Sequence, residues 1–255
     1  GIFLDMMGLP PQDRMYLRRL AEISSDSPVL EEKITAAKEL ADYCDKHLDD
    51  RIANPRDDVM TMVTKFEIDG RPYTRSEMRG TVQLLMAAGL DTVAGMVSFI
   101  ALHFAQNPEH ADYVRSKLGD EKEMHQIVQE FLRRYPIASS SRRLTKDYTY
   151  EGVTMKKGDM ILMPSAFFNL ENRGCPEKVD FERANKRHIT FGSGTHACAG
   201  ALLAREEIRI FLEEWLTRLP DVRLKEGNSP RVEALVLNGV KEMHLAWDPV
   251  VEPAE

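Results

Sequence analysis

The sequence contains few cysteines, and no two of them are closely spaced. Cys44, Cys175 and Cys198 are an odd number of thiols scattered over 255 residues. Such a set excludes a disulfide framework and also a zinc site built from paired cysteines. We therefore expect reduced thiols in a reducing compartment.

The sequence also lacks an excess of basic residues and a long apolar segment at its start. Its net charge of −7 argues against nucleic acid as the main partner, because phosphate binding needs a dense positive surface. The apolar residues 1–7 are too few to span a bilayer, and no basic stretch precedes them to make a signal peptide. We expect a soluble, cytoplasmic protein with neither a membrane nor a nucleic-acid partner.

Internal repeats and low-complexity segments are absent, and helical periodicity dominates the first half of the chain. Apolar spacing and end signals predict helices at residues 11–24, 29–52, 57–65, 74–105, 109–118, 123–134 and 199–219. Alternation predicts strands at 143–153 and 159–163, a hairpin within 232–247, a connector or hairpin edge at 66–72, and an irregular stretch at 168–194. The fold class is therefore mainly α with a minor antiparallel β-sheet.

The longest predicted helix, residues 74–105, has a clear start and stop. Thr74 with Glu77 makes a capping box, and Asn107-Pro108 ends the apolar run. At 1.5 Å per residue this helix is about 45–50 Å long, enough to cross a whole domain. Its middle must therefore be buried.

The most informative segment is residues 191–200, FGSGTHACAG, which leads directly into the last predicted helix. The glycines at 192, 194 and 200 let the backbone approach a flat ligand. Cys198 lies just before a helix N-terminus, where the dipole and free amides favour a thiolate, the form that binds a metal. A lone cysteine is more often a small buried hydrophobe than a ligand. The complete string, and not the cysteine alone, therefore favours a ligand.

Residues 191–200 match F-G-x-G-x-H-x-C-x-G at every fixed position and resemble the cysteine-ligand loop of the cytochrome P-450 family. The resemblance implies a cytochrome P-450-like fold in which Cys198 ligates the iron of haem b and assists O–O cleavage. It implies that His196 hydrogen-bonds a haem propionate, and that Phe191, Gly192 and Gly200 contact the cofactor. The resemblance runs along the whole chain and is greatest to the soluble bacterial camphor hydroxylase group, through strings such as VTMKKGD (153–159) and LTRLP (216–220).

Residues 88–92, AGLDT, are similar to the oxygen-activation motif of the family. By this resemblance Thr92 stabilises the activated oxygen, Asp91 relays protons from solvent, and Gly89 belongs to the cofactor-binding set. The string alone is weak, because small residues in helices usually reflect close packing. A mid-helix threonine also commonly bonds the carbonyl one turn back. We expect such a bond to open the helix locally.

Glu130 and Arg133 lie three residues apart, on one face of a predicted helix. This spacing alone is equally typical of a solvated salt bridge. In sequence order with the other two motifs it resembles the E-x-x-R pair of the family. The resemblance implies a buried, structural pair that holds the segment before the cysteine loop, with Arg183 or a neighbour as third partner.

The resemblance also implies that Arg142 contacts a haem propionate, with Arg143 as the rival assignment. It places small or apolar residues around a substrate pocket, although ordinary core packing is their alternative interpretation. These residues are Leu84, Ala87, Ala88, Ala138, Val236 and Leu237.

The implied function is a monooxygenase that inserts one oxygen atom from O2 into a small apolar, terpenoid-like molecule. Electrons are expected from NADH through a reductase and an iron–sulfur ferredoxin, and Lys186, Arg187 and His188 are candidates for a basic docking face. Gly1 aligns with the middle of a family member, so residues 1–255 are expected to be one haem-thiolate domain without the usual N-terminal segment. Two alternatives stay open: a partial protein that binds haem weakly or serves as an interaction module, and a peroxygenase, which the Asp91–Thr92 pair disfavours.

Overall fold

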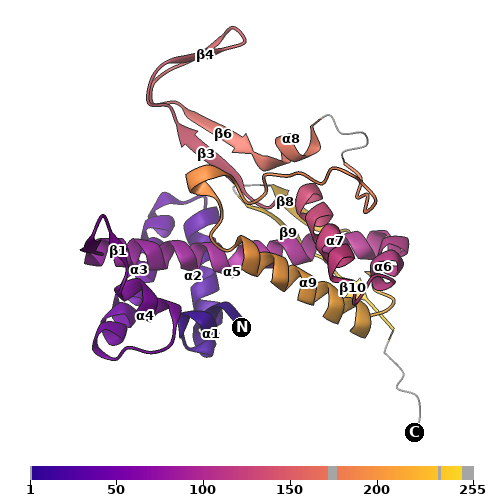
Figure 1. The fold of residues 1–255 in the computed structure, drawn as a ribbon, viewed down its shortest axis with the longest axis horizontal. Coiled ribbons are helices and arrows are strands. Elements are labelled where there is room, and N and C mark those ends of the chain that lie inside the picture. The colour runs from indigo at the N-terminus through magenta and orange to yellow at the C-terminus, as the bar shows by residue number, and fades with distance from the viewer. Residues whose placement is uncertain (1, 172–176, 235–236, 249–255) are drawn as a thin grey trace. The chain divides into compact units, whose positions relative to one another are not determined.

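A computed structural model describes residues 2–171, 177–234 and 237–248. It is mainly helical with small antiparallel sheets, as the sequence predicts (Figure 1). The chain forms two compact units, residues 1–92 and 93–255. The boundary falls inside the long helix α5 (Arg75–Gln106), which contributes to both units.

The first unit is almost entirely helical. The predicted helices at 11–24, 29–52 and 57–65 are confirmed to within a few residues, and residues 66–72 form the predicted hairpin edge. Helix α1 was not predicted, because six residues are too few to show a period. The elements are α1 (Ile2–Met7), the 3-10 helix η1 (Pro11–Asp13), α2 (Arg14–Asp26), α3 (Leu30–Ala53), α4 (Val59–Thr64), β1 (Glu67–Ile68) and β2 (Arg71–Pro72).

The core of the first unit gathers apolar side chains from α1 to α5, and the same unit contains a buried arginine. Arg51 of α3 is 1% exposed, and its guanidinium donates to the Asp58 carboxylate and to the carbonyl of Gly8. Asp58 also caps α4 by accepting from the Thr61 N–H at 2.7 Å. These bonds tie α1, α3 and α4 together, so the buried charge is paired and hydrogen-bonded. The apolar core includes Leu17, Leu40, Leu48, Met60, Val82 and Met86.

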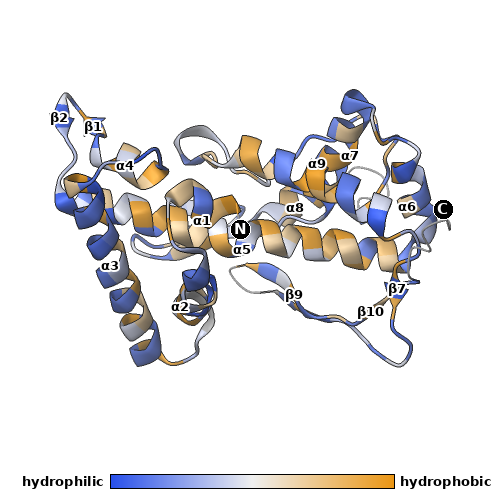
Figure 2. Cartoon of the chain, turned by 90° about the horizontal axis from the view of Figure 1, so that it is seen from below, coloured by the Kyte–Doolittle hydropathy of each residue, from blue (hydrophilic) through white to orange (hydrophobic). Residues whose placement is uncertain are grey.

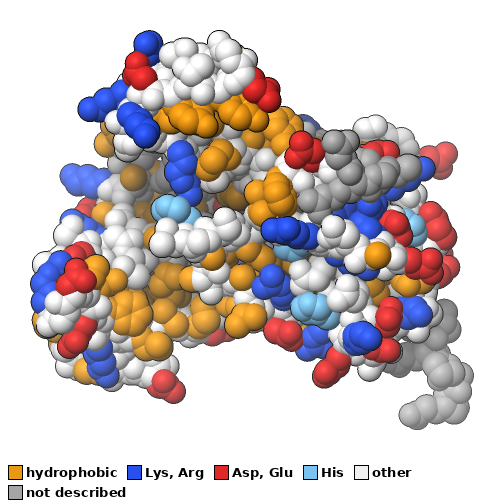
Figure 3. Space-filling model, turned by 45° about the horizontal axis from the view of Figure 1, so that its top comes forward, with side chains coloured by type: hydrophobic (Ala, Val, Ile, Leu, Met, Phe, Trp, Pro, Cys, Tyr) orange, Lys and Arg blue, Asp and Glu red, His pale blue; other side chains and the backbone are white. Residues whose placement is uncertain are grey.

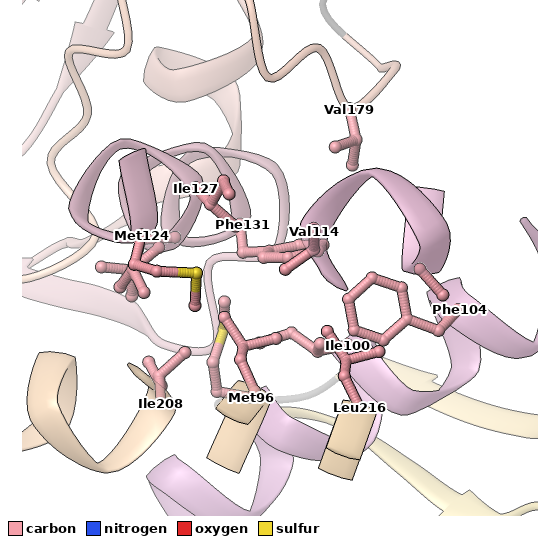
Figure 4. Close-up of a cluster of buried hydrophobic side chains, with 14 of the residues drawn as sticks. Met96, Ile100, Phe104, Val114, Met124, Ile127, Phe131, Val179, Ile208 and Leu216 are labelled. Carbon is pink, nitrogen blue, oxygen red and sulfur yellow. The ribbon is translucent and has the colours of Figure 1, made fainter. Parts of the chain in front are cut away.

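The second unit packs the end of α5 against three further helices, α6 (Pro108–Arg115), α7 (Glu121–Arg134) and α9 (Ala201–Arg218). The close-up in Figure 4 shows Met96, Ile100, Phe104, Val114, Met124, Ile127, Phe131, Val179, Ile208 and Leu216 converging on one apolar cluster. The helices predicted at 109–118, 123–134 and 199–219 are thereby confirmed. Each buries the face that its apolar spacing indicated.

Small antiparallel ribbons complete the second unit. They pair β3 (Ser139–Arg143) with β6 (Met160–Pro164), β4 (Tyr148–Tyr150) with β5 (Val153–Met155), β8 (Arg231–Ala234) with β9 (Asn238–Glu242), and β7 (Arg223–Leu224) with β10 (Leu245–Ala246). Three predictions need correction. The strand expected at 143–153 is split among β3, β4 and β5. Strand β3 begins earlier, at Ser139, and its run of serines shows no alternation of apolar and polar residues. The tail hairpin holds only β8 and β9, since β10 pairs with β7. The stretch expected to be irregular contains the second half of α8 (Ser165–Leu170).

Helix α5 begins at the predicted capping box. The Thr74 N–H donates to Glu77 Oε2 at 2.8 Å, and the Glu77 N–H donates back to Thr74 Oγ1 at 3.3 Å. By length and composition alone α5 could cross a membrane, and its apolar colouring is evident in Figure 2. Part of this apolar surface is used in the protein interior, because Val82 and Met86 belong to the first core and Ile100 to the second. A core helix of a soluble protein passes the same test.

A chain of polar side chains lies beside the aromatic core of the second unit. His103 of α5 is 6% exposed. Its Nδ1 lies 2.8 Å from the Tyr135 hydroxyl, and its Nε2 lies 2.8 Å from Nδ1 of His110. Burial, together with the neighbouring His110 and Arg134, lowers the pKa of His103 from 6.5 to about 4. His103 is therefore neutral in the folded protein at pH 7.

This depressed pKa makes stability depend on pH. An unfolded chain takes up a proton on His103 near pH 6.5, whereas the folded chain does so only near pH 4. Above pH 6.5 the neutral His103 leaves the free energy of unfolding at its full value. As the pH falls from 6.5 toward 4, the free energy of unfolding decreases, by about 3 kcal/mol in total. We expect urea unfolding of His103→Gln to depend less on pH between 7 and 4.5 than that of the wild type. Equal pH dependence in wild type and His103→Gln would contradict this account.

Candidate functional site

The cysteine loop, residues 191–200, is held by its own backbone. The Cys198 N–H donates to the Phe191 carbonyl at 2.8 Å, and the Ala197 N–H donates to the Gly194 carbonyl at 3.1 Å. Gly192 has φ +70°, and a Cβ there would lie 2.9 Å from the backbone oxygen of His196. A side chain at this position would force the backbone apart, so the loop can close only around a glycine.

The loop leaves the sulfur of Cys198 exposed at the start of α9. No side chain caps α9, so the amides of its first turn are not used by a cap, and the positive end of the helix dipole lies next to the cysteine loop. Gly200 keeps one side of the sulfur open, because a Cβ there would lie 3.9 Å from Sγ. His196 ends the short 3-10 helix η2 (Gly194–His196) and is also exposed. Cys175 lies outside the described residues.

Aromatic and basic side chains pack at the N-terminal end of the cysteine loop. The Arg205 guanidinium lies over the Phe191 ring at 4.6 Å from its centroid, and Phe191 packs against the second core. His188 Nε2 lies 2.8 Å from Gln129 Oε1. Burial, with the nearby Arg205 and Arg133 charges, lowers the pKa of His188 to about 4.

The basic docking face expected at residues 186–188 therefore needs correction. His188 is neutral and largely turned inward, where it contacts α7. Lys186 is half-buried and donates from Nζ to the Arg183 carbonyl at 2.9 Å. Arg187 alone of the three is exposed. The run of basic residues in the sequence did not reveal that two of them, Lys186 and His188, make contacts within the fold.

The Glu130–Arg133 pair is wholly buried, with both side chains 0% exposed. Arg133 donates from Nη2 to Oε1 and from Nε to Oε2 of Glu130, each at 2.8 Å. Glu130 Oε1 also accepts from the Asp180 N–H at 2.9 Å, and Arg183 Nε lies 3.5 Å away. Arg133 donates further to the Lys178 carbonyl at 2.9 Å. The pair thus ties α7 to the segment that leads into the cysteine loop.

Asn169 completes this connection and was missed by sequence reasoning. Its buried amide donates to the carbonyl of Arg133 at 3.1 Å and to Thr190 Oγ1 at 2.9 Å. Its oxygen accepts from the Ile189 N–H at 2.9 Å. One side chain thereby joins α8, α7 and the base of the cysteine loop. A single asparagine after an apolar run gives no sequence signal of such a role.

The AGLDT segment lies within α5. Thr92 Oγ1 donates to the carbonyl of Ala88 at 2.8 Å, the bond expected of a mid-helix threonine. Helix α5 runs without interruption from Arg75 to Gln106, so the expected local opening does not break the helix. Asp91 Oδ1 lies 3.8 Å from Nε of Arg18 in α2. Nothing in the sequence pointed to Arg18.

Gly89, placed by resemblance in the cofactor-binding set, has a packing role in this structure. A Cβ at Gly89 would lie 2.3 Å from the ring of Phe3 in α1. The missing side chain lets α1 approach α5 closely. Contact between Gly89 and a cofactor stays a prediction that depends on the motif.

The predicted pocket residues lie in both units. Leu84, Ala87 and Ala88 share one exposed face of α5 in the first unit, since they lie three and four residues apart. Ala138 and Leu237 meet in the second unit, where they form an isolated antiparallel bridge. Val236 lies outside the described residues.

The rival arginines occupy successive positions of one strand. Arg142 pairs with Ile161 and Arg143 with Met160, so the two side chains leave the β3–β6 ribbon on opposite faces. Only one of the two arginines can therefore contact a given ligand. Arg142 is exposed and donates from Nη1 to the Ser141 carbonyl at 2.8 Å.

The donor set fits a haem better than a bare metal ion. Within the described ranges, no three His, Cys, Asp or Glu side chains gather in a way that could hold a metal. A metal bound to Cys198 must therefore bring its other ligands, as haem iron does with its porphyrin nitrogens. Leu202, in the first turn of α9, is 78% exposed and offers apolar surface beside the loop.

Comparison with known proteins agrees with this geometry. The family model described as "Cytochrome P450" matches residues 24–235. The chain belongs to the cytochrome P450 family. The cytochrome P450 cysteine, oxygen-activation and E-x-x-R motifs predicted from the sequence all fall inside the matched range.

Relatives and solved structures extend the match to nearly the whole chain. The chain is 36% identical to the "Probable cytochrome P450 127A1" of Sinorhizobium fredii, over 85% of this chain and 52% of that protein. It is 30% identical to the "Steroid C26-monooxygenase" of Rhodococcus jostii, over 95% and 52%. The solved structure of cytochrome P450 CYP101C1 superposes with a TM-score of 0.83 at 33% identity, over 97% and 62%. The chain spans about half the length of the two curated relatives.

The buried E-x-x-R pair of this cytochrome P450 should dominate the stability of the site. Glu130→Gln keeps the shape of the side chain but leaves the Arg133 charge unpaired, which should lower the free energy of unfolding by about 3–5 kcal/mol. Glu214→Gln removes an exposed pair with Arg218 and should cost less than about 1 kcal/mol. Urea unfolding of both variants measures the difference, and equal small losses would show that the buried pair does not hold the fold.

Proposed function

We propose that the protein is a haem-thiolate monooxygenase that inserts one oxygen atom from O2 into a small apolar molecule. The observation that carries this proposal is the exposed sulfur of Cys198 at the uncapped start of α9, in a loop whose closure requires Gly192. A haem needs one accessible sulfur ligand beside an apolar surface, and Cys198 offers both. A structural cysteine is buried and does not offer an accessible sulfur.

The proposed cofactor is haem b, and the sulfur of Cys198 would hold its iron. When bound, it supplies the activation of dioxygen. The chain would orient it: Gly192 lets the loop close, Gly200 leaves space beside the sulfur, and His196 and Arg142 are proposed to bind its propionates. Both of these polar side chains are exposed, and Arg142, which uses Nη1 on the Ser141 carbonyl, has further N–H donors for a carboxylate.

Asp91 is proposed to relay protons from solvent during the reaction, and Thr92 is proposed to hold the proton donor in place. Because Thr92 uses its hydroxyl hydrogen on the Ala88 carbonyl, its oxygen lone pairs remain able to hold a proton donor. Asp91 is partly exposed and lies 3.8 Å from Arg18, so it can exchange protons with solvent while its orientation is restrained. This division of roles suits general acid catalysis, which needs correctly placed donors.

The proposed substrate is small, apolar and terpenoid-like. Leu84, Ala87 and Ala88 present an uncharged face of α5, and Ala138 with Leu237 presents a second apolar surface. Apolar walls bind such molecules and exclude water from the reaction. Electrons are proposed to come from NADH through a reductase and an iron–sulfur ferredoxin, in a soluble, cytoplasmic protein.

A second candidate function is an interaction module that binds haem weakly. Large apolar side chains lie at the surface, and Figure 3 shows them in orange. Contiguous exposed patches of this kind mark association surfaces. The most exposed include Leu84, Met160, Phe167 and Leu202.

The carbon-monoxide spectrum of the reduced protein separates the two candidates. We expect a strongly red-shifted Soret band, because the thiolate of Cys198 donates electron density to the iron. Cys198→Ala should abolish the shift. Cys44→Ala should retain it, since Cys44 is buried and burial raises its pKa to about 12, so it stays a thiol. An unshifted band, or no haem in the wild type, would favour the interaction module.

The role of Thr92 can be tested against a matched hydroxyl on the same helix. Thr92→Ala should keep haem and the shifted band but divert about tenfold more reducing equivalents to peroxide, in a system reconstituted with NADH, reductase, ferredoxin and a monoterpene. Ser98 makes the same bond to a carbonyl four residues back, with Oγ 2.7 Å from the Ala94 oxygen. Ser98→Ala should leave peroxide release unchanged. Unchanged coupling in Thr92→Ala would remove its assigned role.

A further inference from the structure

Asn238, the first residue of β9, joins two segments that lie about 100 residues apart in the sequence. Its backbone N–H donates to the Ile137 carbonyl at 2.7 Å. Its side-chain Nδ2 donates to the Pro136 carbonyl at 3.0 Å. One residue therefore satisfies two successive carbonyls of a distant segment.

Those two carbonyls lie between two regular elements, in a segment that belongs to neither. Helix α7 ends at Arg134, and its last turn is closed by the Tyr135 N–H. Strand β3 begins only at Ser139. Pro136 and Ile137 are buried between these elements, where an unpaired carbonyl is costly, so donors must come from elsewhere in the fold. Asn238 supplies both.

The bridge between Ala138 and Leu237 lies directly beside these bonds. The Ala138 carbonyl accepts from Ser165 Oγ at 2.9 Å, which fixes the segment on its other side. Ile137 is 6% exposed and packs in the second core, whereas Ala138, next in the extended segment, is exposed. The bonds from Asn238 thus hold the exposed Ala138 at a fixed separation from Leu237.

Helix α5 leaves space for this junction. A Cβ at Gly95 would lie 3.4 Å from the Asn238 carbonyl oxygen and 3.6 Å from Cγ2 of Ile137. The junction therefore packs against α5 at a glycine three residues after Thr92. Three segments meet at Asn238: α5, residues 136–138 and the start of β9.

We propose that Asn238 is a positioning residue that fixes the wall formed by Ala138 and Leu237 and thereby sets the size of substrate accepted. This role rests on the proposed monooxygenase function. It depends on a donor, because both atoms that Asn238 contacts with N–H groups are carbonyl oxygens. A carboxylate of the same shape places an acceptor against the Pro136 carbonyl and leaves that carbonyl without a donor.

The test compares two iron-binding probes of different size on the full chain loaded with haem. Imidazole is small enough to be insensitive to the wall, whereas 4-phenylimidazole must fit against it. Asn238→Asp should weaken 4-phenylimidazole binding by about tenfold in spectral titrations and change imidazole binding by less than about twofold. Asn238→Ser is a milder change that keeps a shorter donor. Its affinity for 4-phenylimidazole should lie between those of the wild type and Asn238→Asp. Asn228→Asp is the matched control, since Asn228 donates to the Glu226 carbonyl at 3.2 Å on the surface, and it should leave both probes unaffected.

Two results on the loaded protein overturn the proposal. Equal weakening of both probes would mean that Asn238 only supports the fold, and no change in either would mean that the wall is set by other residues. Hydrogen exchange at the Asn238 amide, measured without haem, should be faster in Asn238→Asp and Asn238→Ser than in wild type. A wild type without a thiolate-type carbon-monoxide band would overturn the proposed function and the size selection with it. Hydrogen exchange without haem would still test whether Asn238 holds the junction. Unchanged exchange in the variants would overturn this role as well.

Discussion

The buried contact between Glu130 and Arg133 is the constraint on which the rest of the site depends. Two opposite charges removed from water are stabilising only when every remaining polar atom finds a partner. Here the carboxylate accepts from Arg133 twice and from the Asp180 N–H, and the guanidinium donates onward to the Lys178 carbonyl. A planar guanidinium can make these several directed bonds, whereas a lysine could not. The segment before the cysteine loop is therefore placed by α7, and the position of Cys198 follows from it.

The two described cysteines show how environment decides chemistry within one chain. Cys44 is enclosed in the first core, and burial raises its pKa to about 12, so it behaves as a small apolar side chain. Cys198 is exposed, precedes an uncapped helix and has an open side at Gly200. The same functional group thus serves packing in one unit and is proposed to hold a cofactor in the other.

Local features of the sequence predicted local features of the structure. The helix ranges, the capping box at Thr74 and the glycine at 192 follow from residues that lie close together in the chain, so pattern and turn chemistry were enough to find them. Partners such as Asn169, Arg18 and Asn238 were missed because each acts across the fold, and a single polar residue has no periodicity that announces a distant contact. Strand β3 was misplaced for a related reason: its pairing with β6, and not its own serines, defines where it begins.

Two of the three glycines of the cysteine loop, Gly192 and Gly194, should differ in what evolution or random mutagenesis permits. Both have positive φ, +70° at Gly192 and +61° at Gly194. At Gly192 a Cβ meets the backbone of His196, whereas at Gly194 no atom lies within 4 Å of it. An asparagine, which adopts left-handed conformations more readily than most residues, fits position 194 at modest strain and has no place at 192. A saturation library of the loop would therefore retain one glycine as invariant and let the other drift.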